Sequence, residues 1–150
     1  ESARIIISHI TEGVKMADKH NLPTFIKDFI LTHHGLGITK YFYIKYQNEH
    51  PEEEVDKKLF SYPGPNPFTR EQALLMMADT VEAASRSLPE YTEESIKALI
   101  DRLVDTQLEE GHFKECPITF RDIAVAKAVM LERLKSIYHT RVSYPTLKQA

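Results

Sequence analysis

The spacing of apolar residues along the chain predicts helices rather than strands. Apolar side chains fall at the spacing of one helix face between residues 5 and 16. A second helix is expected to begin at Pro23 and to stop at Gly35, and a third, rich in aromatic residues, covers about 38–48. Alternation of apolar and polar residues, which would indicate a strand, is almost absent.

Three further helices are expected in the second half of the chain. Thr69 and Gln72 form a capping box, in which each side chain covers the other's unpaired backbone N–H, and this helix is expected to run to about Ser87. Thr92 caps the next helix, and Thr119 begins the last one. The helix after Thr92 carries an apolar stripe, which consists of Ile96, Leu99, Ile100, Leu103 and Leu108. The pattern predicts an all-α domain.

Two segments interrupt the helical pattern. The acidic run 52–56 lies in a charged stretch and is expected to be a solvated loop. Residues 61–68, SYPGPNPF, contain three prolines and a glycine, which excludes a regular helix. Residues 62–67 are interpreted either as a wall of a substrate cleft or as a rigid connector.

Composition places the chain among ordinary globular domains. It has 150 residues, 42% of them hydrophobic and 27% charged, which fits one domain with a real core. The formal net charge of -3 provides no field that attracts DNA, RNA or an anionic membrane, so no nucleic acid partner is expected. The lone Cys116 excludes an internal disulfide and favours a reducing cytoplasm. No apolar run is long enough to span a bilayer, so the domain itself is expected to be soluble.

Four polar side chains occupy positions where the helical pattern would place apolar ones. His9, His33, His34 and Asp79 each follow apolar residues by three or four positions, so all four are expected to face the core. Imidazole nitrogens and a carboxylate oxygen are ligands that borderline divalent metals accept. A single histidine on an apolar face is more commonly a hydrogen-bonded core residue, so spacing alone leaves both interpretations open. The adjacent pair is more informative, because neighbours on a helix point about 100° apart and can serve two metals, or a metal and a phosphate.

Longer runs of sequence resemble a known family. The runs are SHITEG (8–13), LPTFIKDFILTHHG (22–35), YFY (41–43), YPGPNPFTREQALLMMADTVEAASRSL (62–88), ECPITFRDI (115–123) and IYHTRVSYP (137–145). Together they closely resemble the intracellular HD domain of the seven-transmembrane HD family, bacterial membrane-anchored hydrolases of cyclic di-AMP. The resemblance implies that residues 1–150 form an HD-type helical bundle, the C-terminal cytoplasmic part of a longer membrane protein.

The resemblance also implies a centre that holds two divalent metal ions, iron or manganese, in the complete domain. By motif, His9 and His33 match ligands of one metal, His34 matches a further ligand or a phosphate contact, and Asp79 matches the Asp of the other metal. His34 and Asp79 are therefore the candidate catalytic residues. The family pattern starts with an isolated His and a His-Asp doublet, and no such doublet occurs in this chain. We expect a domain that lacks its N-terminal part, rather than a decayed enzyme, with at most one well-held metal and low activity.

Three further residues are candidates for substrate binding. Arg86 follows Asp79 by seven positions, where it can reach a phosphate through a bidentate contact or form an ordinary pair with Glu82. Tyr41 and Tyr43 follow the histidine pair, where a ring can stack on adenine or pack in the core.

The activity implied by the resemblance is metal-dependent hydrolysis of cyclic di-AMP to linear pApA at the cytoplasmic face of the membrane. Two alternatives stay open: an HD phosphohydrolase that acts on another nucleotide, and a non-catalytic domain that binds a cyclic dinucleotide and signals. The cyclic di-GMP subclass has Glu after its His pair and a GYP signature close behind, whereas Gly35 follows His34 here. The sequence leaves the metal, the base and a homo-oligomeric state undetermined.

Overall fold

The computed structural model describes residues 1–139, which contain six α-helices, one short 3-10 helix and no β-strand. The all-α prediction is therefore confirmed, and the end of the run 137–145 lies outside the described residues. The elements are α1 (Ser2–Lys19), α2 (Thr24–Thr32), α3 (Lys40–Glu49), η1 (Lys57–Phe60), α4 (Arg70–Ser85), α5 (Glu93–Glu109) and α6 (Phe120–Tyr138). None of these described helices combines the length and the apolar composition that a bilayer crossing requires.

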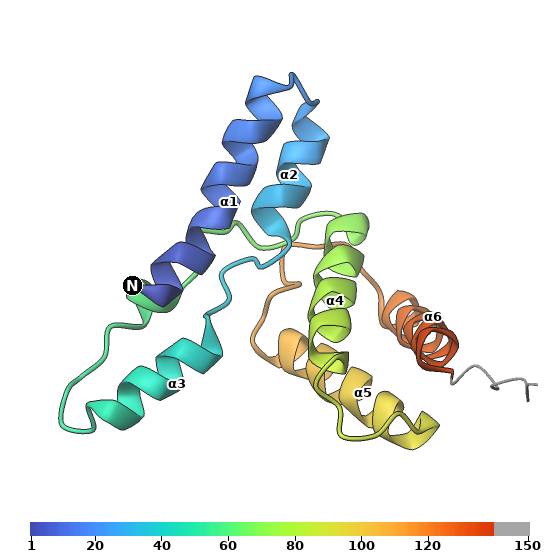
Figure 1. Cartoon of the computed structure of the whole chain (residues 1–150). Coiled ribbons are helices and arrows are strands. Elements are labelled where there is room, and N and C mark those ends of the chain that lie inside the picture. Colours follow the sequence, from blue (N-terminus) through green and yellow to red (C-terminus); the bar gives the residue numbers. More distant parts are fainter. Residues whose placement is uncertain (140–150) are drawn as a thin grey trace, which may run out of the picture.

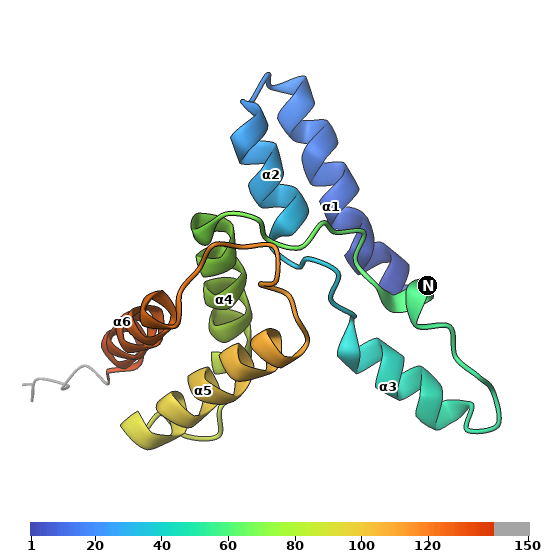
Figure 2. The same cartoon turned by 180° about the vertical axis from the view of Figure 1, so that it is seen from behind.

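The helices form two groups that meet near the middle of the chain. Helices α1 and α2 make an antiparallel pair, and α4, α5 and α6 make the second group (Figure 1). The two groups touch where α2 packs against α4. Helix α3 extends from the junction beside η1, as the view from behind also shows (Figure 2). The loops that enter α3 and leave η1 are tied by an isolated antiparallel bridge between Ile38 and Ser61.

The main core lies among α4, α5 and α6. Its buried side chains include Met77, Val81, Ile100, Val104 and Ile123. The stripe predicted on α5 is confirmed: Ile96, Leu99 and Ile100 are buried, and Leu103 and Leu108 are half-buried against the same core. This core holds α4 in place, and α4 carries Asp79.

The starts of the three later helices are those that the caps predicted. Thr69 and Gln72 form the capping box of α4, and Thr119 with Asp122 does the same for α6. Thr92 caps α5 through the Ser95 backbone N–H. Helix α4 ends at Ser85, two residues before the expected end. Cap chemistry is local, which explains why the sequence predicts it well.

The predicted inward face of α1 is only partly confirmed, because Ile10 is buried but other apolar residues of that face are exposed. Ile5 is 66% exposed, and the side chains that α1 buries are Ala3, Ile10 and Ala17. A Cβ on Gly13 would lie 2.9 Å from Ile30 Cγ2, so this glycine allows α1 and α2 to approach closely. His9 lies one turn before Gly13 and is exposed rather than core-facing. The close approach of the two helices nevertheless places it beside the end of α2.

Replacing Thr69 with Ala is expected to lower the free energy of unfolding by about 1 kcal/mol, because a backbone N–H at the start of α4 loses its partner. Thr69→Ser keeps the hydroxyl and is expected to stay close to wild type. Urea denaturation followed by circular dichroism measures both. Equal destabilisation by the two substitutions would show that the hydroxyl does not stabilise α4.

Candidate metal centre

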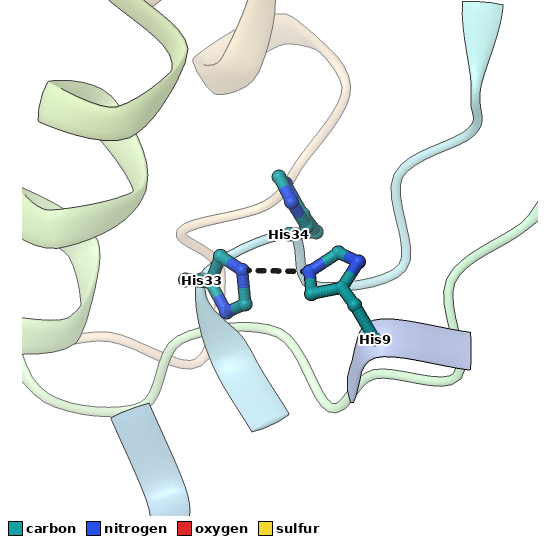
Figure 3. A group of neighbouring side chains, drawn as sticks. All are labelled: His9, His33 and His34. Atoms are coloured by element: carbon teal, nitrogen blue, oxygen red, sulfur yellow. Dashed lines mark hydrogen bonds between the residues drawn. The ribbon is translucent and has the colours of Figure 1, made fainter. Parts of the chain in front are cut away.

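Three histidines from α1 and the end of α2 meet at the junction of the two helix groups. Figure 3 shows the rings of His9, His33 and His34 turned toward one another. One ring nitrogen from each lies within 4.8 Å of the other two, and His9 Nε2 is 3.1 Å from His33 Nε2. The structure thus brings together three residues that the sequence placed on two separate helices.

The hydrogen bonds of His9 and His33 determine which ring nitrogen is left for a ligand. His33 Nδ1 donates to the Ile30 carbonyl at 2.8 Å, and His9 Nδ1 makes the same kind of contact with the Ile6 carbonyl. A carbonyl oxygen only accepts, so Nδ1 carries the hydrogen in both rings. In the neutral rings both Nε2 atoms therefore present lone pairs, and two lone pairs facing each other repel. A cation between them would turn this repulsion into coordination, and backbone carbonyls commonly orient metal-ligating histidines in this way.

The spacing of these two nitrogens fits a shared cation. Imidazole binds first-row metals at roughly 2.0–2.1 Å, so two nitrogens at right angles about one ion lie about 3.0 Å apart. The separation of 3.1 Å between His9 Nε2 and His33 Nε2 agrees with that geometry. The donor set and its spacing therefore fit a divalent metal.

His34 is half-buried and stacks on Tyr62. The two ring centroids are 4.3 Å apart and the ring planes differ by 20°. Burial, with the neighbouring His33 and His9, lowers the pKa of His34 to about 4, so its ring is neutral at pH 7. Burial and then the charge of Asp79 raise the pKa of Tyr62, so its phenol stays protonated. The stacked pair is an uncharged wall beside the two facing nitrogens.

Asp79 is the predicted ligand that lies outside the group of three histidine nitrogens. Its Oδ2 is 3.8 Å from His34 Nδ1, longer than a hydrogen bond. The group of three ring nitrogens includes no carboxylate. Asp79 is half-buried rather than core-facing, and its side chain is 42% exposed. The structure places Asp79 beside His34, where it can orient this ring or complete a second set of ligands.

The three residues predicted to bind substrate lie outside the histidine cluster. Arg86 donates from Nη2 and Nε to the same carboxylate oxygen of Glu82, at 2.7 and 3.0 Å. This is the surface ion pair that was the alternative to a phosphate contact. Tyr41 is 70% exposed and its ring lies edge-on to that of Phe42, and Tyr43 packs edge-on against Phe60. The structure therefore gives each of the three a contact that does not involve His9, His33 or His34.

Tyr62 is the neighbour of the cluster that sequence reasoning did not single out. Only its membership of the segment 62–67, interpreted as a cleft wall or a connector, pointed to it. Asn66 from the same loop accepts from the Leu36 backbone N–H at 2.9 Å, just after the histidine pair. Gly35 makes this possible, because its φ is 53° and a Cβ there would lie 2.5 Å from Asn66 Oδ1. The loop that contains Asn66 therefore packs closely against the end of α2. This packing places Tyr62, from the same loop, against the ring of His34.

Comparisons with known proteins identify relatives of this chain. No protein-family model matches the chain. The cyclic-di-AMP phosphodiesterase PgpH of Bacillus subtilis is 35% identical over 144 residues, which cover 96% of this chain and 20% of that protein. The protein of the same name from Listeria monocytogenes is 37% identical over 146 residues, which cover 97% and 20%. The chain therefore spans about a fifth of the length of these curated relatives.

A solved structure is similar over nearly the whole chain. The crystal structure of the L. monocytogenes PgpH HD domain in complex with cyclic-di-AMP matches with a TM-score of 0.87 at 36% sequence identity. The match covers 95% of this chain and 66% of that one. The two chains are therefore similar both in fold and in sequence.

The stability of the metal-free chain is expected to fall with acid partly through His34. Its pKa of about 4 in the folded chain lies below the value of roughly 6.5 in an unfolded chain, so the folded form binds fewer protons between these values. Stability from this residue is complete above pH 6.5 and is lost as the pH falls toward 4. After allowance for partial solvent exposure, the loss amounts to about 1–2 kcal/mol.

Urea denaturation between pH 7 and pH 4.5, in the presence of a chelator, measures this dependence. His34→Gln is expected to show a shallower loss of stability than wild type. His20→Gln, a change at an exposed histidine, is the matched control and should leave the slope unchanged. Identical slopes in wild type and His34→Gln would contradict the assignment.

Proposed function

We propose that this chain, which belongs to the HD-domain family of the PgpH cyclic-di-AMP phosphodiesterases, forms part of a metal centre that hydrolyses cyclic di-AMP to linear pApA. The observation that carries the proposal is the pair of facing Nε2 atoms of His9 and His33, 3.1 Å apart, with His34 beside them. A pure binding domain has no need of such a pair. The relatives and the solved structure carry the phosphodiesterase name and a bound cyclic-di-AMP, respectively.

The proposed centre holds iron or manganese, two ions in the complete domain. His9 and His33 would hold the first ion through Nε2, Asp79 would hold the second, and His34 would be a further ligand or a phosphate contact. When bound, such cations lower the pKa of a water molecule and offset charge on the attacked phosphate. Imidazole with carboxylate suits both metals, so the ligands alone do not choose between them.

The residues around the ligands have defined tasks in this proposal. The carbonyls of Ile6 and Ile30 hold the rings of His9 and His33 so that Nε2 faces inward. Tyr62 limits rotation of His34 by stacking on it. Asp79 presents a carboxylate from α4 beside His34, close to the phosphate that is attacked. Arg86 would contact the phosphate only by exchanging Glu82 for it, because its guanidinium is already paired.

A phosphate held at this centre also explains how an acidic chain can take an anionic substrate. The formal net charge of -3 would repel a dinucleotide rather than attract it. Cations at the histidine cluster would supply the positive charge locally and only where the reaction takes place.

Replacing Asp79 with Asn is expected to lower pApA formation by at least 100-fold, because an amide is a much weaker metal ligand and leaves the phosphate charge uncompensated. Asp18→Asn is the matched control, since Asp18 is an exposed residue paired with Lys27 near the far tip of the α1–α2 pair. Single-turnover reactions with protein in excess over cyclic di-AMP and with added Mn²⁺ detect even slow product formation by mass spectrometry. Retention of activity in Asp79→Asn would remove this residue from the centre.

The same assay with cyclic di-GMP tests the substrate class. Cyclic di-AMP is expected to be hydrolysed with a kcat/KM at least tenfold higher, because Gly35 replaces the Glu that follows the His pair in the cyclic di-GMP subclass. Equal rates for the two substrates would contradict the proposed preference. Binding of cyclic di-AMP without any pApA would support the non-catalytic alternative.

A further inference from the structure

A chain of hydrogen bonds links the start of α3 and the end of α5 to the backbone that follows the histidine pair. Lys40 Nζ is 2.5 Å from Glu110 Oε1, and Glu110 Oε2 is 3.1 Å from His112 Nε2. His112 Nδ1 is 3.0 Å from Asn66 Oδ1, and this same oxygen accepts from the Leu36 backbone N–H at 2.9 Å. His112 is the middle residue of this chain of contacts, and it is only 6% exposed.

The end of α5 directs His112 toward the loop that carries Asn66. The chain reverses at Gly111, whose φ is 79°. The His112 backbone N–H then donates to the Gln107 carbonyl at 3.1 Å. The Gly111 N–H donates to the Leu108 carbonyl at 3.0 Å. These two bonds make a Schellman motif, a helix end that fixes the direction in which the chain leaves, so local backbone geometry holds His112 in place.

The two acceptors around His112 determine where its hydrogens lie. The Leu36 N–H can only donate, so the Asn66 atom that faces it is the carbonyl oxygen, and His112 Nδ1, which faces the same oxygen, carries a hydrogen. Burial opposes ionisation of Glu110, but hydrogen bonds from Lys40 and His112 hold the pKa of this carboxyl below its usual value. An ionised carboxylate only accepts, so His112 Nε2 carries a hydrogen as well. The ring is therefore an imidazolium ion between a carboxylate and an amide oxygen.

The histidine pair lies where its helix no longer holds the backbone. Helix α2 ends one residue before His33, so both His33 and His34 follow its last residue. The next anchor of this backbone is the bond from the Leu36 N–H to Asn66. Tyr62 lies in the same loop as Asn66 and stacks on His34. A group that fixes Asn66 therefore restrains both the backbone after the pair and the ring that covers it, and a charged donor does so more strongly than a neutral one.

We propose that His112, held with both ring nitrogens protonated, positions the histidine pair for metal binding through Asn66. The inference rests on the proposed function, because it assigns a positioning residue to the proposed metal centre. A neutral His112 has only one N–H, so it would turn a lone pair toward one of its two acceptors. The other titratable side chains that line the cavity beside His112 are those of His34, Lys40, Tyr62 and Glu110.

Nitrogen-15 NMR of the wild-type chain at pH 7 tests the protonation state and needs no variant. The two nitrogens of an imidazolium have similar chemical shifts, whereas those of a neutral imidazole are widely separated. We expect the imidazolium pattern for His112, assigned from its own backbone resonances, and the neutral pattern for His34. A neutral pattern for His112 would overturn the proposal, whether or not its variants fold.

Two substitutions test the path from His112 to the metal. His112→Phe keeps a flat ring and removes both donors, and it is expected to speed exchange of the Leu36 amide hydrogen and to weaken Mn²⁺ binding about tenfold each. Asn66→Leu removes the acceptor and should weaken Mn²⁺ binding equally, with no further loss in the double variant, because the two residues act through one contact. His112→Gln keeps one donor for Asn66 and is expected to stay within about threefold of wild type. His20→Phe, at an exposed histidine, is the matched control.

The outcomes separate this inference from the proposed function. If wild type forms pApA while His112→Phe matches it in Leu36 exchange and in Mn²⁺ affinity, the positioning role is wrong and the function stands. If His112→Phe loses Mn²⁺ affinity as expected but wild type forms no pApA, the positioning role stands and the function fails. Additive losses in the double variant would show that His112 does not act through Asn66. A wild-type chain that binds no Mn²⁺ would overturn both.

Discussion

His9 Nε2 and His33 Nε2 lie 3.1 Å apart, each on a ring whose other nitrogen is committed to a carbonyl of its own helix. Two neutral imidazoles held in this way present lone pairs to each other, which is unfavourable unless a cation or an added proton lies between them. The helix packing that imposes the contact therefore costs stability in the metal-free chain and returns it on metal binding. A cation bound at the candidate site would remove this repulsion between the two lone pairs.

The surrounding fold serves to hold that contact. Gly13 lets α1 approach Ile30 of α2 closely, and the two histidines follow from the same approach one turn away. The proline-rich loop then covers the third histidine, because Asn66 fixes the backbone after the histidine pair and Tyr62 stacks on His34. Helix α4, anchored by the main core, brings Asp79 beside His34. Each contact is made by a different segment, so the site depends on how the two helix groups pack.

The sequence predicted local features well and long-range contacts poorly. The caps at Thr69 and Thr119 and the buried stripe of α5 depend on residues within a few positions, and all were confirmed. The predicted inward orientation of His9 was wrong. Helix α1 has apolar residues on several faces, and it buries the face that neighbouring elements cover. Here that face contains small residues, Ala3 and Ala17, which pattern reasoning undervalues.

Residues brought in by loops were beyond sequence reasoning. Tyr62 reaches His34 from 28 positions away through a loop with no periodic pattern, so no rule of spacing could pair them.

The most direct test of the account is the Mn²⁺ affinity of the 150-residue chain, followed by electron paramagnetic resonance in which bound nitrogen ligands are resolved. We expect about one tightly bound Mn²⁺ per chain with imidazole nitrogen coupling, and at least about 100-fold weaker binding in both His9→Ala and His33→Ala, because each removes one of the facing nitrogens. His20→Ala, at an exposed histidine elsewhere on α1's end, should bind like wild type. Mn²⁺ binding that is absent in wild type, or equal in all four proteins, would contradict the claim that these two nitrogens share a cation.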